Sequence, residues 1–205
     1  MATRESSDKK AELLERVVDH VLENGVGQLT LRGLATAVGS NNRMLLYYFG
    51  SREELVVAAL HGAERRFPGI VGVVDHLAGP DLPLDRRLLA VWRTVSDPVN
   101  QPFNRLFFEV FGLASFDRER YASLLGDIGT AWVGQVAAAY RAEGVEEARA
   151  ESLAHETVAL WRGFQATLLS AGSSEAVDRA AVEATAALVA RVRGAGASPA
   201  DGTSY

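Results

Sequence analysis

The segment that decides the fold is residues 29–55, which reads LTLRGLATAVGSNNRMLLYYFGSREEL. Its apolar residues recur at helical spacing in two short runs, and Gly39 separates these runs. Thr30 is a good N-cap for the first run, and Ser51 followed three residues later by Glu54 forms the capping-box pattern that begins a further helix. Because glycine tolerates the unusual backbone angles of a tight turn, the segment predicts two short helices joined at Gly39.

Two short helices around such a turn are typical of a helix-turn-helix, in which the helices cross closely and need a small residue such as Ala35 at the crossing. The shared apolar seam would consist of Leu31, Leu34, Val38, Leu45 and Phe49, and the outward residues of the second helix would be Asn41, Asn42, Arg43, Met44, Tyr47 and Tyr48. Arginine and asparagine suit guanine and adenine edges in the major groove, while tyrosine hydroxyls suit phosphates. The alternative is that the two asparagines only cap a helix and the tyrosines belong to an ordinary surface.

The charge distribution favours an anionic partner for this segment. The whole chain of 205 residues has 21 basic and 26 acidic residues and a formal net charge of −5. Between positions 26 and 52, however, the only charged residues are Arg32, Arg43 and Arg52, all of them basic. An acid-free stretch inside an acidic chain is a local electrostatic footprint for an anion such as DNA.

Two stretches, LTLRGLATAVG at 29–39 and MLLYYFGSREEL at 44–55, resemble the DNA-binding domain of the TetR family of bacterial transcription regulators. The resemblance implies that Thr30 and Arg32 contact the DNA backbone or an adjacent base, and that Asn42, Arg43 and Met44 face base edges. It further implies that Tyr47, Tyr48 and Arg52 hold phosphates. The chain departs from the common family pattern at Leu46 and Tyr48, where many members have tyrosine and histidine.

The remainder of the chain has helical periodicity and no convincing strand pattern, which predicts an all-α fold of about nine helices. We expect them near 6–24, 30–38, 41–48, 51–67, 84–96, 98–116, 117–143, 146–171 and 174–193, with Asp117 capping the seventh. The segment 68–83, rich in Gly, Pro and Val, favours a loop or broken helix, and two short strands are the alternative. The predicted domains are a helix-turn-helix domain over 1–52, an effector-binding and dimerisation domain over 53–193, and a disordered tail over 194–205. We expect Gly62 and the Pro68-Gly69 end to make the fourth helix pliable.

A single helix-turn-helix domain offers too few DNA contacts for selective binding. Two copies that bind a palindromic operator one DNA turn apart would supply enough contacts. The last two helices carry apolar stripes that could form a homodimer surface, namely Leu153, Leu160, Phe164 and Leu168 on one and Ala181, Ala184, Leu188 and Val192 on the other. The resemblance implies that these helices pair with their mates in a four-helix bundle. The alternative is that both stripes pack inside one chain.

Large aromatic residues are frequent in the middle helices and predict a cavity for a mostly apolar small-molecule effector. The predicted lining comprises Trp92, Phe103, Phe107, Phe111, Trp132, Trp161 and Phe164, with Gln135, Arg105, Glu109 and His155 as polar candidates that could orient the ligand. Ordinary core packing is the alternative for each of these residues.

The sequence favours no enzymatic, metal-binding or membrane function. It contains no cysteine, no phosphate-binding glycine loop and no nucleophile elbow, and His155-Glu156 lacks the second histidine of a zinc-protease motif. No apolar run reaches the roughly 20 residues of a membrane-spanning helix. We therefore expect a cytoplasmic DNA-binding regulator without cofactor or catalytic residues, and the resemblance implies that it is a repressor. One alternative is a helical ligand-binding protein or enzyme without DNA function. Another is a regulator whose signal is a partner protein and not a small molecule.

Overall fold

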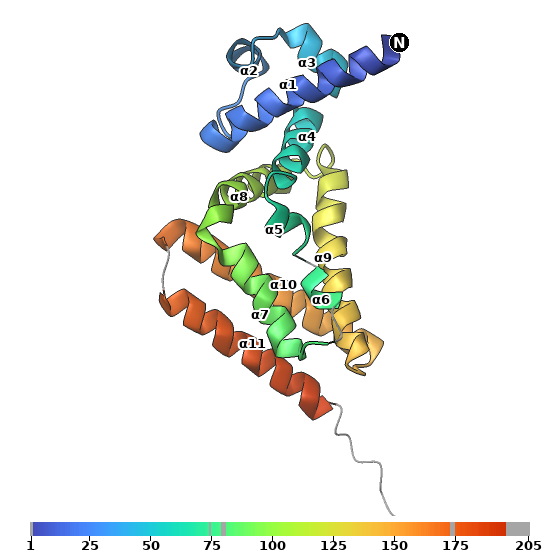
Figure 1. Ribbon diagram of the computed structural model, residues 1–205, viewed down its shortest axis with the longest axis vertical. Coiled ribbons are helices and arrows are strands. Elements are labelled where there is room, and N and C mark those ends of the chain that lie inside the picture. The colour runs from blue at the N-terminus through green and yellow to red at the C-terminus, as the bar shows by residue number, and fades with distance from the viewer. Residues whose placement is uncertain (1, 74, 79–80, 173–174, 196–205) are drawn as a thin grey trace, which may run out of the picture. The chain divides into compact units, whose positions relative to one another are not determined.

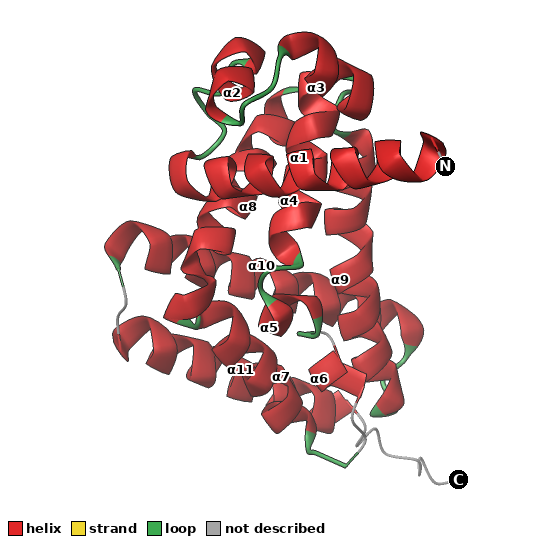
Figure 2. Cartoon of the chain, turned by 45° about the horizontal axis from the view of Figure 1, so that its top comes forward, coloured by secondary structure: helices red, strands yellow, loops and turns green. Residues whose placement is uncertain are grey.

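The computed structural model of the chain describes residues 2–73, 75–78, 81–172 and 175–195, and this part is all-α (Figure 1). It contains eleven α-helices and one short 3-10 turn, and Figure 2 shows helices and loops without a strand in the described residues. The predicted fold class is confirmed. The count exceeds nine because the segment 68–83 contains two helices of four residues each, α5 (Pro68–Val71) and α6 (Asp75–Ala78), which agrees with the broken helix that was expected.

Contacts divide the chain into two compact units, and each unit is built from two separate stretches of sequence. The first unit comprises residues 1–71 and 98–127, and the second comprises residues 72–97 and 128–205. The first unit therefore contains the predicted helix-turn-helix together with helices that follow it much later in the chain. The functional domains 1–52 and 53–193 stay a prediction.

The first unit begins with α1 (Ala2–Asn24), which extends further toward the N-terminus than the expected range of 6–24. The helices α2 (Leu31–Ala37), α3 (Asn42–Phe49) and α4 (Arg52–Glu64) follow, and α8 (Gln101–Phe116) packs against α1 and α4. A 3-10 turn, Pro98–Asn100, precedes α8. The core of this unit is formed by completely buried side chains that include Val17, Val18, Leu45, Leu55 and Val56.

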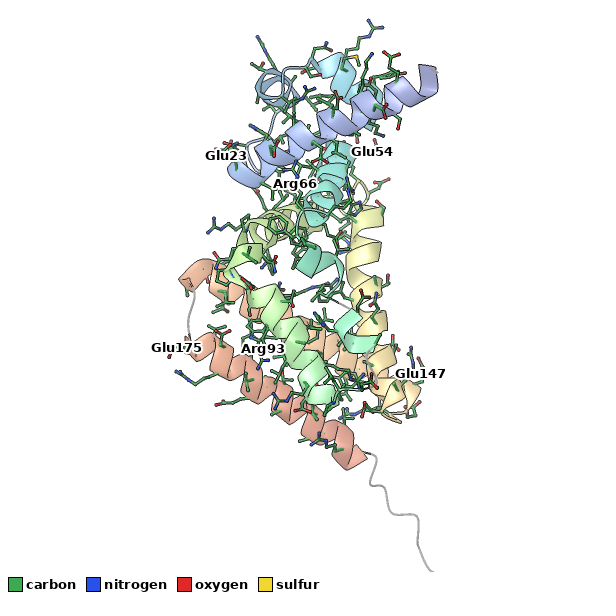
Figure 3. The ribbon with its side chains drawn as sticks, viewed as in Figure 1. Glu23, Glu54, Arg66, Arg93, Glu147 and Glu175 are labelled. Atoms are coloured by element: carbon green, nitrogen blue, oxygen red, sulfur yellow. The ribbon has the colours of Figure 1, made fainter. Side chains whose placement is uncertain are left out.

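The crossing of α1 and α4 depends on Gly62, which is buried in α4. A Cβ atom at position 62 would lie 2.6 Å from Cγ2 of Val18, much closer than real Cβ contacts. The glycine therefore permits close helix packing, and the structure gives no support to the expectation that it makes α4 pliable. Arg66, labelled in Figure 3, lies in the turn after α4 and links this turn to α1, because its guanidinium binds Glu15, at 2.6 Å, and Asp19.

The second unit contains α6, α7 (Leu84–Ser96), most of α9 (Ala122–Ala142), α10 (Glu147–Ala171) and α11 (Glu175–Ala195). The expectation that Asp117 caps the helix after it is wrong, because Asp117 follows the end of α8 and α9 begins only at Ala122. The chain from 117 to 121 instead forms a turn in which the amide of Tyr121 donates to the carbonyl of Asp117. Residues 196–205 of the predicted tail lie outside the described residues, whereas Gly194 and Ala195 still belong to α11.

The second unit contains a buried hydrogen bond that links α9 to α10. The hydroxyls of Tyr140 and Thr157 lie 2.7 Å apart, and Thr157 also donates to the carbonyl of Leu153. Tyr140 has no exposed surface, and its burial raises the pKa of its phenol, although the hydrogen bond to Thr157 acts in the opposite direction.

Replacing Tyr140 with phenylalanine is expected to lower the free energy of unfolding at pH 8 by about 1 kcal/mol, the typical net contribution of one hydrogen bond. Because the folded state raises the pKa of the phenol, its stabilising effect is complete below the unfolded pKa of about 10 and is lost as the pH rises through the folded value. The difference between the wild type and Tyr140→Phe should therefore shrink above about pH 10. Urea unfolding at pH 8 and pH 10.5 measures it, and a difference that grows with pH would contradict the assignment.

None of the helices in the described residues combines the length and apolar character needed to cross a bilayer.

Candidate nucleic-acid interface

The helix-turn-helix forms as the sequence predicts, and a side-chain cap defines the start of each of its two helices. The hydroxyl of Thr30 accepts the amide of Gly33 at 3.1 Å and caps α2, and the side chain of Asn41 accepts the amide of Met44 at 3.0 Å and caps α3. Between them, Gly39 has a positive φ of 63°, a conformation that favours glycine. Half of the capping box at the start of α4 is present, since the hydroxyl of Ser51 accepts the amide of Glu54 at 3.1 Å. The carboxylate of Glu54 accepts the Ser51 hydroxyl at 2.9 Å, whereas the Ser51 amide donates to the carbonyl of Phe49.

The apolar seam of the motif is buried, and this burial directs the polar residues of α3 outward. The seam residues with less than a tenth of their surface exposed are Leu34, Ala35, Val38, Leu45 and Phe49, whereas Leu31 is half-buried. The amide of Ser40, in the turn after α2, donates to the carbonyl of Ala35 at 2.8 Å. Ala35, the small residue expected at the crossing, is buried.

Most of the predicted DNA-contacting residues lie on the exposed surface of this motif. The exposed ones are Thr30, Arg32, Asn41, Asn42, Arg43 and Tyr47, and the half-buried ones are Met44, Tyr48 and Arg52. The side chains of Arg32, Asn42 and Arg43 make no hydrogen bond or ion pair with any other described residue. Tyr47 has 71% of its surface exposed and packs edge-on against Tyr48 with ring centroids 5.1 Å apart. Thr30 and Asn41 differ from the other exposed residues because their side-chain oxygens already cap α2 and α3.

Arg52 has an internal role that sequence reasoning did not predict. Its Nε donates to the carbonyl of Leu29 at 3.0 Å, its Nη2 donates to the carbonyl of Val26 at 3.3 Å, and its Nη1 lies 3.7 Å from Glu53. The guanidinium therefore ties α4 to the loop that precedes α2. The phosphate contact implied by the family resemblance would have to use the remaining N–H groups of this side chain.

We expect Arg52→Ala to weaken binding to all duplex sequences alike, because the loop before α2 loses two hydrogen-bond donors. The salt dependence should stay unchanged, because an internal arginine releases no counterions from DNA. Titrations at four salt concentrations provide the measurement, since losing a phosphate contact would instead reduce the slope of log K against log salt by about 1. A reduced slope would return Arg52 to the role implied by the family resemblance.

Glu109 was expected among the polar residues of an effector cavity, but the structure places its carboxylate elsewhere. It lies on α8, and its carboxylate accepts the amides of Val26, at 2.8 Å, and Gly27, at 2.6 Å, in the loop between α1 and α2. In the sequence, the pattern Gly25-Val26-Gly27 directly before the helix-turn-helix is the only indication of this contact. It could not identify Glu109 as the partner, because Glu109 lies more than eighty positions away.

The residues predicted to bind an effector fall into both compact units. Phe103, Phe107 and Phe111 lie along α8 in the first unit, and the rings of Phe107 and Phe111 stack with centroids 6.1 Å apart. In the second unit Trp92 packs edge-on against Phe164 at 5.6 Å, and Trp132 packs against Trp161 at 6.4 Å. Trp92 and Trp161 are buried, as core packing also requires.

A cavity of about 350 Å³ lies within the second unit. Its lining includes the predicted residue Gln135 and otherwise consists of apolar residues and an ion pair of which only the arginine is buried, namely Leu77, Ala78, Arg87, Ala138, Ala139, Ala142 and Glu143. None of the predicted aromatic residues lines this cavity. Groups of three or more side chains able to hold a metal ion are absent from the described residues.

The residues predicted for dimerisation mostly face the inside of the second unit. Leu153, Leu168, Ala181 and Leu188 are buried, while Leu160 and Ala184 are half-buried, and α10 and α11 pack against each other. The apolar stripes therefore contribute to the core of a single chain, which was the alternative stated above. The exposed positions of the same helices combine charged residues with small ones, and the small ones include Ala159, Gly163, Ala166, Val182 and Ala186.

Comparison with solved structures shows that the chain has the fold of TetR-type regulators. A protein from Rhodococcus sp. assigned to the TetR family of transcriptional regulators matches with a TM-score of 0.66 and 18% identity, over 92% of this chain and 98% of that one. The multidrug binding protein EbrR, solved in complex with imidazole, matches with a TM-score of 0.67 and 20% identity, over 96% and 93%. A TetR-like transcriptional regulator from Rhodococcus sp. RHA1 matches with a TM-score of 0.61 and 18% identity, over 90% and 94%. No protein-family model and no curated protein matches the sequence.

Proposed function

We propose that the protein is a DNA-binding transcriptional regulator whose reading element is α3. The observation that supports this proposal best is the exposed face of α3, where Asn42, Arg43 and Tyr47 project from a motif whose apolar seam is buried. An arginine and an asparagine on one exposed helix match the donor and acceptor pattern of the major groove. No acidic residue lies between Val26 and Arg52, so nothing in this segment repels the DNA backbone.

We further propose that the regulator is a cytoplasmic homodimer that represses from a palindromic operator. The small exposed residues of α10 and α11 support a helix pairing between two copies, because Ala159, Gly163 and Ala166 share one face of α10. Two copies would place two α3 helices in successive major grooves, with half-sites about one helical turn apart. Light scattering at micromolar concentration tests this part, since a monomeric mass would contradict it.

The proposed effector is a mostly apolar small molecule that binds among the helices that follow the helix-turn-helix. The second unit supports this with its cavity of about 350 Å³, because this volume lies within the range of small-molecule sites. Gln135 supplies both a donor and an acceptor there, while the alanines supply an apolar wall. The ligand changes DNA affinity only if it binds one conformation better than another. A thermal-shift screen of apolar compounds, repeated with Gln135→Leu, tests the site.

Selection of bound sequences from a random duplex pool at moderate salt tests the central proposal. We expect a palindromic motif with half-sites about one helical turn apart. A folded protein that enriches no sequence, with and without the compounds found by thermal shift, would overturn the DNA-binding function.

A further inference from the structure

The loop before the helix-turn-helix is wrapped around the carboxylate of Glu109 from α8. Oε2 of Glu109 accepts the amide of Val26 at 2.8 Å, and Oε1 accepts the amide of Gly27 at 2.6 Å. Two successive backbone amides that point to one side form a concave anion site. Here the anion is supplied by the chain itself, so the loop is fastened to a helix that follows it by about eighty residues.

The two glycines of this loop are necessary for the carboxylate to fit. A Cβ at position 25 would lie 2.5 Å from Oε2 of Glu109, and a Cβ at position 27 would lie 2.8 Å from Oε1. Gly25 also has a positive φ of 71°, but Gly27 does not, so only the nearby carboxylate constrains the side chain at position 27. The sequence Gly-Val-Gly is therefore shaped for the acid that occupies it.

The same loop is held from its other side by α4. Arg52 donates to the carbonyls of Leu29 and Val26, so Val26 has its amide bound by α8 and its carbonyl bound by α4. The next residue after Leu29 is Thr30, which caps α2. Since α8 also packs against α1 and α4, the reading motif and α8 form one body inside the first unit.

Resting on the proposed DNA-binding function, we propose that Glu109 is a positioning residue for the reading motif. By fixing the Gly25–Gly27 turn to α8, its carboxylate sets the direction in which α2 and α3 leave the loop. In a dimer this direction determines the distance between the two α3 helices, and with it the half-site spacing that the protein accepts. Glu109 touches no DNA in this scheme, and its effect passes entirely through the loop.

The test compares Glu109→Ala and Gly27→Ala with Gly112→Ala, using the duplex obtained by selection with the wild type. The two test variants break the same contact from opposite sides, because an alanine at 27 displaces the carboxylate. Gly112 is the matched control, since it lies on the same α8 and an added Cβ there meets no atom within 4 Å. Affinity is measured for the selected spacing and for duplexes with one base pair inserted or removed between the half-sites.

We expect the wild type and Gly112→Ala to distinguish strongly between these spacings. Glu109→Ala and Gly27→Ala should bind the selected duplex about tenfold more weakly, the scale of one charge-assisted hydrogen bond, and should lose most of the spacing preference. The double variant should lose little more than either single variant, because both changes act on one contact. Amide exchange at Val26 and Gly27 should become faster in the test variants and not in the control.

Melting curves from circular dichroism identify a temperature at which every variant is folded, and the binding measurements are made there. Under this condition a variant that is only less stable keeps the spacing preference of the wild type. Faster exchange at Val26 and Gly27 with unchanged affinity and spacing preference would overturn the proposal, because the contact would then be only structural. Failure of the wild type to select any duplex would instead overturn the proposed function, and this outcome is distinct because it appears before any variant is made.

Discussion

Replacing Arg87 with alanine is expected to lower the free energy of unfolding of the second unit by about 3 kcal/mol, the lower end for removal of one partner of a buried ion pair, because only the arginine of this pair is buried. Only 4% of the Arg87 side chain is exposed, and it satisfies three acceptors at once. Nε donates to the carbonyl of Leu82 at 3.1 Å, Nη1 donates to that of Leu77 at 2.8 Å, and Nη2 binds the carboxylate of Glu143. Alanine would leave the buried carbonyl of Leu77 without this donor.

The magnitude lies at the lower end because Glu143 keeps 37% of its side chain exposed and can be solvated again. Arg86→Ala is the control, since Arg86 is the exposed neighbour on the same helix and its loss should change stability by less than about 0.5 kcal/mol. Urea unfolding followed by tryptophan fluorescence reports on this unit, because Trp92, Trp132 and Trp161 all belong to it. Equal midpoints for both variants would show that the buried arginine contributes nothing.

Replacing Arg43 with alanine is expected to weaken binding to the selected duplex by about 1–3 kcal/mol, or roughly 5–150-fold, and to relax the sequence choice at one position of each half-site. Arg43 is exposed near the start of α3 and has no partner among the described residues, so its guanidinium is available to a base edge. The change should not lower stability, because no internal contact is lost.

The measurement is a second selection from the random pool with Arg43→Ala, followed by titration of the wild-type motif. Arg118→Ala is the control, because Arg118 is exposed in the turn after α8 and outside the reading motif. It should reproduce the wild-type motif at unchanged affinity. An Arg43→Ala motif that equals the wild type in every position would remove Arg43 from base reading.

Features decided by neighbouring residues could be predicted from the sequence. The caps at Thr30 and Ser51 and the turn at Gly39 all depend on interactions within a few residues, so the boundaries of α2, α3 and α4 agree closely with expectation. At Asp117 the local signal was present but led to a turn and not to the long helix, because its side chain accepts the amide of Arg120 while α9 begins only at Ala122.

Features decided by distant residues were not predictable. Helical periodicity identified the apolar stripes of α10 and α11, but it could not tell whether the partner would be another helix of the same chain or a second copy. Arg87 and Glu109 were not predictable for the same reason. A charged residue in a helix is assigned to the exposed surface unless its partner is known. Their partners, Glu143 and the loop at 26–27, lie more than fifty positions away.

The division of each compact unit between two stretches of sequence has a consequence for protein engineering. A chimaera made at a single crossover after α3 or α4 would combine the reading helices of one protein with the α8 of another. Such a hybrid would lack the matched pair of glycine turn and Glu109, and also the apolar surface that α8 offers to α1 and α4. Exchange of DNA specificity between relatives therefore requires either two crossovers that carry residues 98–127 along, or point substitutions confined to the exposed face of α3.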